Sequence, residues 1–244
     1  GYTSTDEKDV NLTLENGDLL LCRSEDSFVP FGFWTHVGIY DKKMNVVIEA
    51  RPPLGVGFFP LSDWFYPNLT CVEVLRVETD QPTRDAAVDF AWTQIGCPFD
   101  LFNLLHCEKL SDNFDGLGWY CSELVWAAYL NTSSGKVNIL DKSFYTSTTP
   151  MEIDLDDDTV VIGEHKEFIP QKPYWSILWG EAECPVDLVI TDPNGLMLTK
   201  ETSGIQKAIY SEVDVNNDGE LYDLFAIQRP KVGTYLIQVI PESN

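Results

Sequence analysis

Short apolar runs separated by polar turns characterise the first third of the chain and predict β-strands. Residues 19–22 form a continuous apolar run, which is typical of a buried strand. Residues 35–40 and 46–50 are two further runs on either side of a short polar segment, and this arrangement predicts a hairpin. Residues 71–77 alternate between apolar and polar side chains, as a half-buried strand does.

Two segments show the periodicity of helices. The first is expected to begin at Gln81 and to end before Gly96, and its apolar residues share one face: Ala87, Phe90, Ala91 and Ile95. The second is expected over residues 121–130, with a single apolar side: Leu124, Val125, Ala128 and Tyr129. Helices and strands are mixed without strict alternation, and this mixture predicts an α+β fold.

The composition changes near residues 150–173, where an acidic run and three prolines occur. We therefore predict a boundary near residue 170, with one domain over residues 1–170 and a second over residues 171–244. No helix is predicted in the second domain. Short strands separated by turns are expected there instead, at residues 175–179, 186–191, 208–213, 224–228 and 234–240. This pattern resembles a small β-sandwich.

The charge of the chain argues against nucleic acid and anionic membranes as partners. The sequence has 16 Lys and Arg residues against 39 Asp and Glu residues, so its formal net charge is −23 at pH 7. Such a surface repels phosphate backbones and anionic lipid headgroups. The apolar runs are also shorter than the roughly 20 residues that a membrane-spanning helix needs. We therefore expect no integral membrane segment.

We expect an exported protein, either secreted or located at the cell surface or in the periplasm. No secretory signal begins the sequence, but a mature chain looks the same once its leader has been removed. Three Asn-x-Ser/Thr sequons fit export: Asn11, Asn68 and Asn131. The six cysteines lack CxxC spacing and the chain has only three histidines, which excludes a zinc ribbon or finger.

The strongest chemical signal is Cys121, at the expected start of the second helix. Unpaired amide groups and the helix dipole favour a thiolate at such a position, and the thiolate is the nucleophilic form of cysteine. A buried core cysteine without a catalytic role is the alternative. Glu123 would oppose a negative charge there, so we expect its side chain to turn toward solvent or toward a cationic partner.

His36 and Glu49 stand in the two otherwise apolar strands of the expected hairpin, where burial without a partner is costly. If the turn comprises residues 41–44, His36 lies directly opposite Glu49 on one face of the sheet. A five-residue loop would instead place them on opposite faces. In the first case Glu49 accepts a hydrogen bond from one imidazole nitrogen and leaves the other nitrogen to deprotonate Cys121.

Five segments together resemble the YiiX-like, circularly permuted NlpC/P60 cysteine peptidases: Gly17-Asp18-Leu19-Leu20, Thr35-His36-Val37-Gly38-Ile39, Val47-Ile48-Glu49-Ala50, Gly96-Cys97-Pro98-Phe99-Asp100 and Tyr120-Cys121-Ser122-Glu123-Leu124-Val125. In that group the histidine precedes the cysteine along the chain, as it does here. The resemblance spans about residues 14–165. It implies Cys121 as nucleophile, His36 as base and Glu49 as its orienting partner, on a papain-like core in which an antiparallel sheet packs against helices.

A second candidate site lies in the expected C-terminal domain. The sequence from Asp214 to Glu220 matches the first half of a calcium loop, with oxygen ligands at alternate positions and glycine at the sixth. Phe225 occupies the twelfth position, where an EF-hand has glutamate, and this excludes an EF-hand. The alternatives are a plain turn between strands and a looser structural calcium site built from four residues: Asp214, Asn216, Asp218 and Asp223.

Three functions are consistent with these residues. The first is a cysteine hydrolase that cleaves amide bonds, in cell-wall or related peptides, through a thioester and without a required metal or organic cofactor. The second is hydrolysis or transfer of a lipid acyl group, because the permuted group is similar to the lecithin retinol acyltransferase group. The aromatic residues just before His36 would then bind the acyl chain: Phe31, Phe33 and Trp34. The third is a catalytically idle protein whose C-terminal domain attaches it to a surface.

Overall fold

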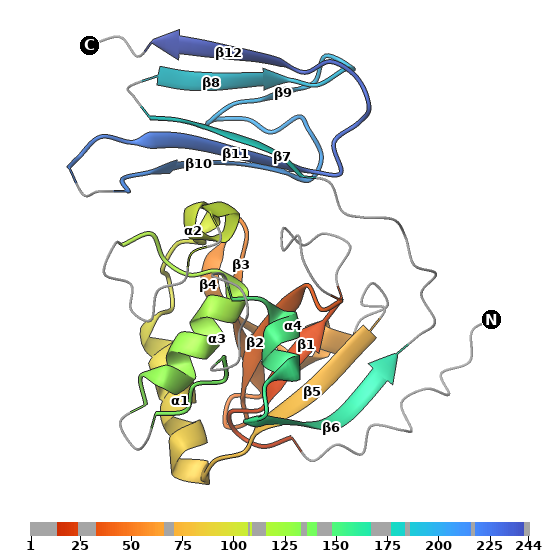
Figure 1. Cartoon of the computed structure of the whole chain (residues 1–244), viewed down its shortest axis with the longest axis vertical. Coiled ribbons are helices and arrows are strands. Elements are labelled where there is room, and N and C mark those ends of the chain that lie inside the picture. Colours follow the sequence, from red (N-terminus) through yellow and green to blue (C-terminus); the bar gives the residue numbers. More distant parts are fainter. Residues whose placement is uncertain are drawn as a thin grey trace.

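The computed structural model describes residues 14–23, 33–65, 71–106, 108, 116–132, 136–140, 148–166, 177–183, 186–215 and 218–241. Figure 1 shows two parts. The first contains helices and one large sheet, and the second contains two small sheets. The predicted α+β fold is confirmed, since the large sheet is antiparallel and helices pack against it. The predicted boundary near residue 170 lies outside the described residues, so the division into domains stays a prediction.

The large sheet has six strands in the order β4-β3-β2-β1-β5-β6. Their bounds are β1 (Leu19–Cys22), β2 (His36–Asp41), β3 (Val46–Arg51), β4 (Gly55–Pro60), β5 (Cys71–Val77) and β6 (Thr159–Lys166). The four strands expected from the apolar runs are therefore present. The other two, β4 and β6, were not predicted, because β4 contains two glycines and ends in proline and β6 carries a glycine and charged residues.

The β2–β3 hairpin differs by two residues from the predicted register. Asp41 pairs with Val46, so the connecting turn comprises residues 42–45. Asp41 stabilises this turn, because its Oδ1 accepts hydrogen bonds from the backbone N–H groups of Lys43 and Met44. A shift of two residues preserves the face on which each side chain lies.

Among the described residues, five helical segments accompany the large sheet: the 3₁₀ helix η1 (Leu61–Phe65) and the α-helices α1 (Gln81–Thr93), α2 (Leu101–His106), α3 (Cys121–Leu130) and α4 (Pro150–Leu155). The predicted bounds of α3 are confirmed. The expectation of one apolar side was wrong, because every residue from 121 to 129 is buried. α3 packs against β2, β3, α1 and α4, so it is covered all round. No helix in the described part of the chain is long and apolar enough to cross a membrane.

The second part consists of two three-stranded antiparallel sheets, in the orders β10-β11-β7 and β12-β8-β9. The strands are β7 (Ile177–Ala182), β8 (Val186–Thr191), β9 (Met197–Leu198), β10 (Ala208–Val213), β11 (Tyr222–Gln228) and β12 (Leu236–Pro241). Both sheets contribute to one apolar cluster: Leu188, Ile190, Leu198, Ile205, Phe225 and Ile227. The described residues of this part form strands without helices, as the sequence predicted.

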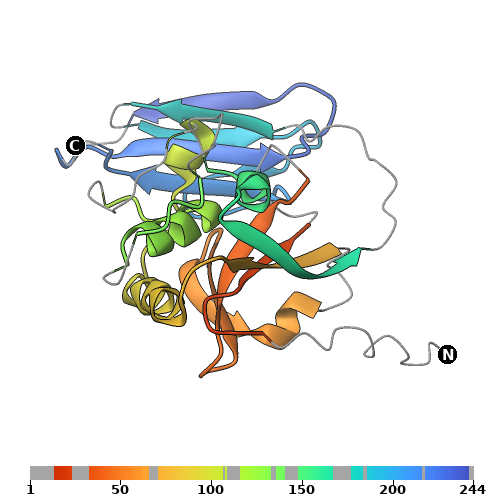
Figure 2. The same cartoon turned by 60° about the horizontal axis from the view of Figure 1, so that its bottom comes forward.

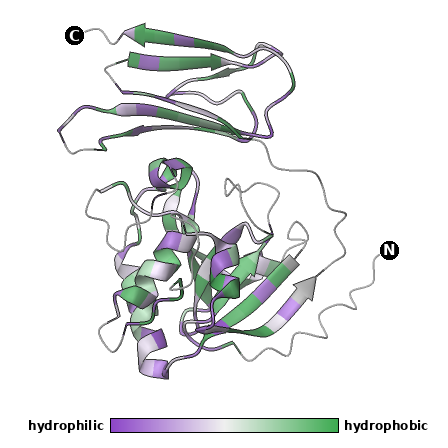
Figure 3. Cartoon of the chain, viewed as in Figure 1, coloured by the Kyte–Doolittle hydropathy of each residue, from purple (hydrophilic) through white to green (hydrophobic). Residues whose placement is uncertain are grey.

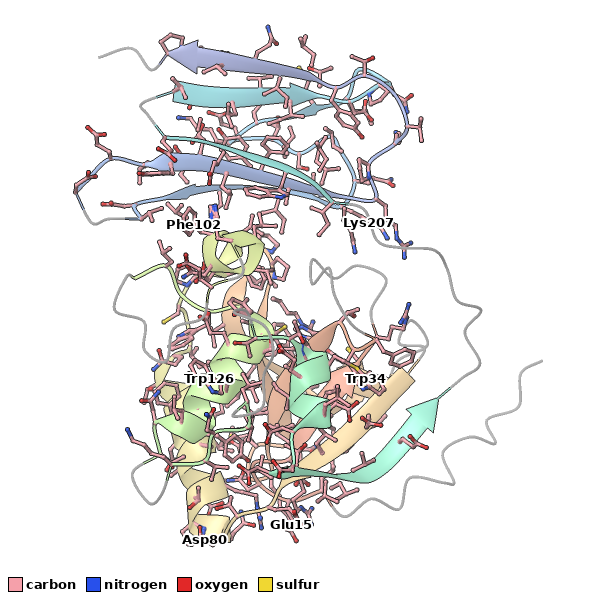
Figure 4. All side chains as sticks on the ribbon, in the orientation of Figure 1. Glu15, Trp34, Asp80, Phe102, Trp126 and Lys207 are labelled. Carbon is pink, nitrogen blue, oxygen red and sulfur yellow. The ribbon has the colours of Figure 1, made fainter. Side chains whose placement is uncertain are left out.

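α2 links the two parts. The imidazole Nε2 of His106, at the end of α2, lies 3.1 Å from the carboxylate Oε2 of Glu181 in β7. The same ring packs edge-on against Trp179, with 5.4 Å between ring centroids, and against Phe102 on its own helix. Figures 2 and 4 show α2, with Phe102 labelled in Figure 4, next to the β10-β11-β7 sheet.

Candidate active site

A short extended segment, bridged to Phe99 through Trp119, leads into α3 and places Cys121 at the first residue of the helix. Just before it, the backbone N–H of Trp119 donates to the carbonyl of Pro98, and the N–H of Asp100 donates to the carbonyl of Trp119, both at 3.1 Å. Tyr120 is extended, with φ −93° and ψ 166°, and forms the N-cap of the helix. The neighbouring segment thus fixes where the helix begins, and with it the position of the thiol.

Gly118 permits this close approach, and Gly118→Ala is expected to destabilise the protein by about 3 kcal/mol or more. Gly118 has φ +99°, and a Cβ atom there would lie 2.0 Å from the carbonyl oxygen of Pro98. Gly116→Ala is the matched control, because Gly116 has φ +75° but nothing within 4 Å of an added Cβ. It should cost only about 1–2 kcal/mol. Denaturant unfolding of both variants measures the difference, and equal losses would contradict the steric explanation.

His36 lies between Cys121 and Glu49. Its imidazole Nε2 is hydrogen-bonded to the carboxylate Oε2 of Glu49. The ring also forms a side-chain hydrogen bond with Cys121. Because Glu49 occupies Nε2, Nδ1 is the nitrogen that remains for the thiol. The structure therefore brings together the three residues that the sequence predicted, from β2, β3 and α3.

Glu49 and Cys121 favour the protonated form of the His36 imidazole. Burial by itself lowers the pKa of His36, but the negative charges of Glu49 and Cys121, with the hydrogen bonds to both, raise it to about 10. Burial by itself raises the pKa of Glu49, but the attraction and hydrogen bonds of His36 and Arg51 lower it overall. The favoured state of His36 is therefore an imidazolium, placed between the Glu49 carboxylate and the sulfur of Cys121.

The candidate site is almost closed to solvent. Cys121 is 2% exposed and Glu49 is fully buried, while the His36 side chain is 15% exposed. Ionic interactions are stronger in such surroundings than in water. The imidazole is therefore the member of the trio that solvent reaches most.

The sequence reasoning missed three neighbours of the site. Trp64 of η1 stacks on the His36 ring, with 5.5 Å between centroids and 18° between planes. Arg51 forms an ion pair with Glu49 at 2.5 Å. Cys22 is the partner of His36 across β1 and β2. Alternation along β3 was a usable signal for Arg51, which is two residues from Glu49 and so on the same face. The strand and helix patterns contain no comparable signal for Trp64.

Cys22 differs chemically from Cys121 although both thiols are buried near His36. Burial, followed by the negative charges of Glu49 and Cys121, raises the pKa of Cys22 well above its ordinary value. Cys22 is in a strand and has no helix N-terminus to stabilise a thiolate. It is therefore held as a neutral thiol, so only Cys121 fits the role of nucleophile between these two.

Glu123 does not turn toward solvent, which was one of its two predicted orientations. Glu123 is 1% exposed, and its carboxylate Oε2 lies 3.5 Å from the backbone N–H of Tyr120. A glutamate at the third helical position reaches back to the N-cap in this way, so it serves the helix start.

The aromatic residues before His36 do not form one exposed wall. Trp34 is buried in the core, and its Nε1 donates to the carboxylate of Asp154 at 3.0 Å. Phe33 is 38% exposed. Phe31 lies outside the described residues. The predicted acyl-binding surface therefore loses Trp34.

The structure separates the residues of the predicted calcium site. Asp223 is buried, and its Oδ2 accepts hydrogen bonds from the Tyr210 hydroxyl and the Leu188 backbone N–H, so it does not belong to the loop. The carboxylate of Asp214 accepts backbone hydrogen bonds from Asp218 and Gly219 within the turn. Asn216 lies outside the described residues. Among the described residues, no group of three or more His, Cys, Asp or Glu side chains is arranged to hold a metal ion.

A thiol at a helix start beside a histidine on an antiparallel sheet is the arrangement of papain-like cysteine hydrolases. The model of the family described as permuted papain-like amidase enzyme, YaeF/YiiX, C92 family, matches residues 13–174. This match covers more than half of the chain, and the chain belongs to that family. The resemblance stated from the sequence is confirmed, and the protein is an enzyme of the amidase class.

One solved structure is similar in fold. It is described as the crystal structure of the metalloprotein yiiX from Escherichia coli O157:H7 and is 16% identical in sequence, with a TM-score of 0.48. The similarity covers 63% of this chain and 98% of that chain. Among curated proteins, none matches this chain.

Proposed function

We propose that this protein cleaves amide bonds in cell-wall or related peptides, with Cys121 as nucleophile, His36 as proton carrier and Glu49 as the residue that orients His36. The observation that carries the proposal is the position of His36, which is hydrogen-bonded to both other residues. Family membership supports amide hydrolysis, and the burial of all three groups supports a functional reason for placing them together.

The geometry supports a two-step reaction. The Cys121 thiolate attacks the carbonyl carbon. The backbone N–H of Cys121 donates a hydrogen bond to the resulting oxyanion, because the first residue of a helix has no carbonyl partner one turn earlier. His36 gives its Nδ1 proton to the leaving amine as the C–N bond breaks, and a thioester remains. Water then attacks the thioester while His36 accepts its proton, which releases the carboxylic acid and restores the thiolate–imidazolium pair.

Cell-wall peptides lie outside the cytoplasm, so the proposal includes an exported enzyme that attaches to a surface through its C-terminal sheets. The support for attachment is β12, in which each residue is exposed. Figure 3 shows that most of this edge strand is hydrophobic. Its exposed apolar residues are Leu236, Ile237, Val239 and Ile240.

The test is product analysis with the purified full chain. Soluble cell-wall peptides, insoluble cell-wall sacculi, and a lipid ester and amide are incubated in parallel and analysed by mass spectrometry. We expect new amine and carboxylate ends only in the peptide samples, and co-sedimentation of the chain with sacculi. Iodoacetamide-treated protein is the control and should be inactive. Products from the lipids alone would instead favour the acyl hydrolase or acyltransferase alternative and would overturn the proposed substrate.

A further inference from the structure

Glu49 is held between two cations on opposite sides of its carboxylate. One oxygen, Oε2, is hydrogen-bonded to the His36 imidazole. The other, Oε1, lies 2.5 Å from the guanidinium Nη2 of Arg51. The Glu49 side chain is fully buried, so water cannot replace either partner. Loss of one cation would leave a buried carboxylate oxygen without its counter-charge.

Arg51 is itself held in place from two directions. It is the last residue of β3, so its side chain shares a face with that of Glu49. Its guanidinium lies over the Phe59 ring of β4, 3.9 Å from the centroid. The Arg51 side chain is 34% exposed, so the ion pair connects the buried site to the surface.

The orientation of a carboxylate depends on both of its oxygens. With Oε1 bound to Arg51, rotation of the Glu49 carboxylate is restricted and Oε2 keeps facing His36. Along the contacts from Arg51 to His36 the charges then alternate: guanidinium, carboxylate and imidazolium, with the Cys121 sulfur next to the imidazolium. Each ion has an opposite neighbour, which is the arrangement that low-dielectric surroundings require.

We propose that Arg51 is a positioning residue of this site, which keeps Glu49 ionised and oriented so that His36 stays aligned with Cys121. The inference rests on the proposed function of Cys121, His36 and Glu49. Arg51 itself pairs with Glu49 and acts on the reaction only through it.

The groups that act on Glu49 define the expected pH dependence. His36 comes from β2, Arg51 from β3 and the neutral thiol Cys22 from β1, while Cys121 of α3 acts on His36. The strand on the other side of β3, β4, carries no ionisable side chain. Arg51 lowers the pKa of Glu49. Removal of Arg51 therefore raises that pKa, and the acid limb of the rate profile moves to higher pH.

The experiment compares Arg51→Gln, Arg51→Lys and the wild-type chain on the peptide that the enzyme cleaves best. We expect Arg51→Gln to lower kcat by about 10- to 100-fold with little change in KM, and to move the acid limb upward by about one pH unit. Arg51→Lys keeps the positive charge and should restore most of the rate and the original acid limb. Lys231→Gln is the charge-matched control, because Lys231 pairs with Asp192 in the C-terminal part, and it should behave as wild type.

The outcomes separate this inference from the proposed function. A wild-type pH profile and rate in Arg51→Gln, together with an inactive Cys121→Ala protein, would overturn the positioning role alone. Full activity of Cys121→Ala would overturn both.

A second experiment applies if Arg51→Gln does not fold, which thermal unfolding would show. Addition of guanidinium chloride to Arg51→Ala is then compared with sodium chloride at equal ionic strength, and rescue by guanidinium alone is expected. Failure of both Arg51→Lys and guanidinium to restore the rate would contradict the inference.

Discussion

Cys121→Ala is expected to lower kcat/KM for amide hydrolysis by about 10³-fold or more. The sulfur is the atom that forms the thioester, and alanine offers no nucleophile in its place. The side chain is buried, but alanine removes only one heavy atom there, so the fold should survive with a loss of about 1 kcal/mol. Steady-state kinetics on the cleaved peptide measures the effect, with thermal unfolding as the test of folding.

The matched control for this variant is Cys97→Ala. The Cys97 thiol donates to the side-chain oxygen of Gln94 at 3.8 Å, and Cys97 follows α1, outside the three elements that carry the trio. We expect its kinetics to match those of the wild type. If Cys121→Ala retains more than about a tenth of the wild-type rate, the assignment of the nucleophile is wrong. Equal losses in the two variants would point to a folding defect instead.

His36→Gln is expected to lower kcat/KM by about 10³-fold and to slow the alkylation of Cys121 by iodoacetamide at pH 6 by about 10²-fold. Glutamine fills a similar volume but carries no positive charge. A thiol with an ordinary pKa of about 8.5 is only about 0.3% ionised at pH 6, so loss of the imidazolium should greatly reduce the thiolate fraction. Mass spectrometry of the peptide that contains Cys121 gives the alkylation rate.

His106→Gln is the control for His36→Gln, because His106 lies at the end of α2, outside the three elements that carry the trio, and pairs with Glu181. Its alkylation rate should equal that of the wild type. Unchanged alkylation in His36→Gln would show that the imidazolium does not stabilise the thiolate.

The stability of the wild type should fall between pH 7 and pH 10 more steeply than that of His36→Gln. The pKa of His36 is raised from its ordinary 6.5 to about 10 in the folded protein. Its contribution to stability is therefore complete below pH 6.5 and is lost as the pH rises through about 10. Urea unfolding of both proteins at the two pH values measures this difference. Parallel pH dependence would contradict the raised pKa.

The hairpin shows how far pattern reasoning reaches. The two strands and their shared face were predicted, since the alternation of side chains along a strand does not depend on the partner. The predicted register was wrong by two residues. The apolar pattern is the same in both registers, and the turn is selected by the Asp41 carboxylate, which accepts hydrogen bonds from the backbone N–H groups of Lys43 and Met44.

α3 shows the opposite case. Its bounds were predicted, but a single apolar face was not observed, because the packing of four elements around it buries Glu123 as well as the apolar residues. Likewise, Asp223 was a candidate calcium ligand by its spacing, whereas its buried carboxylate accepts a hydrogen bond from the backbone N–H of Leu188 in β8.

The sequence by itself determined most of the strands, the two longest helices, the permuted order of histidine and cysteine, and three candidate residues, because these depend on local periodicity and on residue chemistry. Only the tertiary structure decided that Arg51 and Trp64 belong beside His36 and that Cys22 stays a neutral thiol. Those properties depend on which segments approach one another and on how much water they exclude. Neither the approach of distant segments nor the exclusion of water follows from a fixed spacing of residues along the chain.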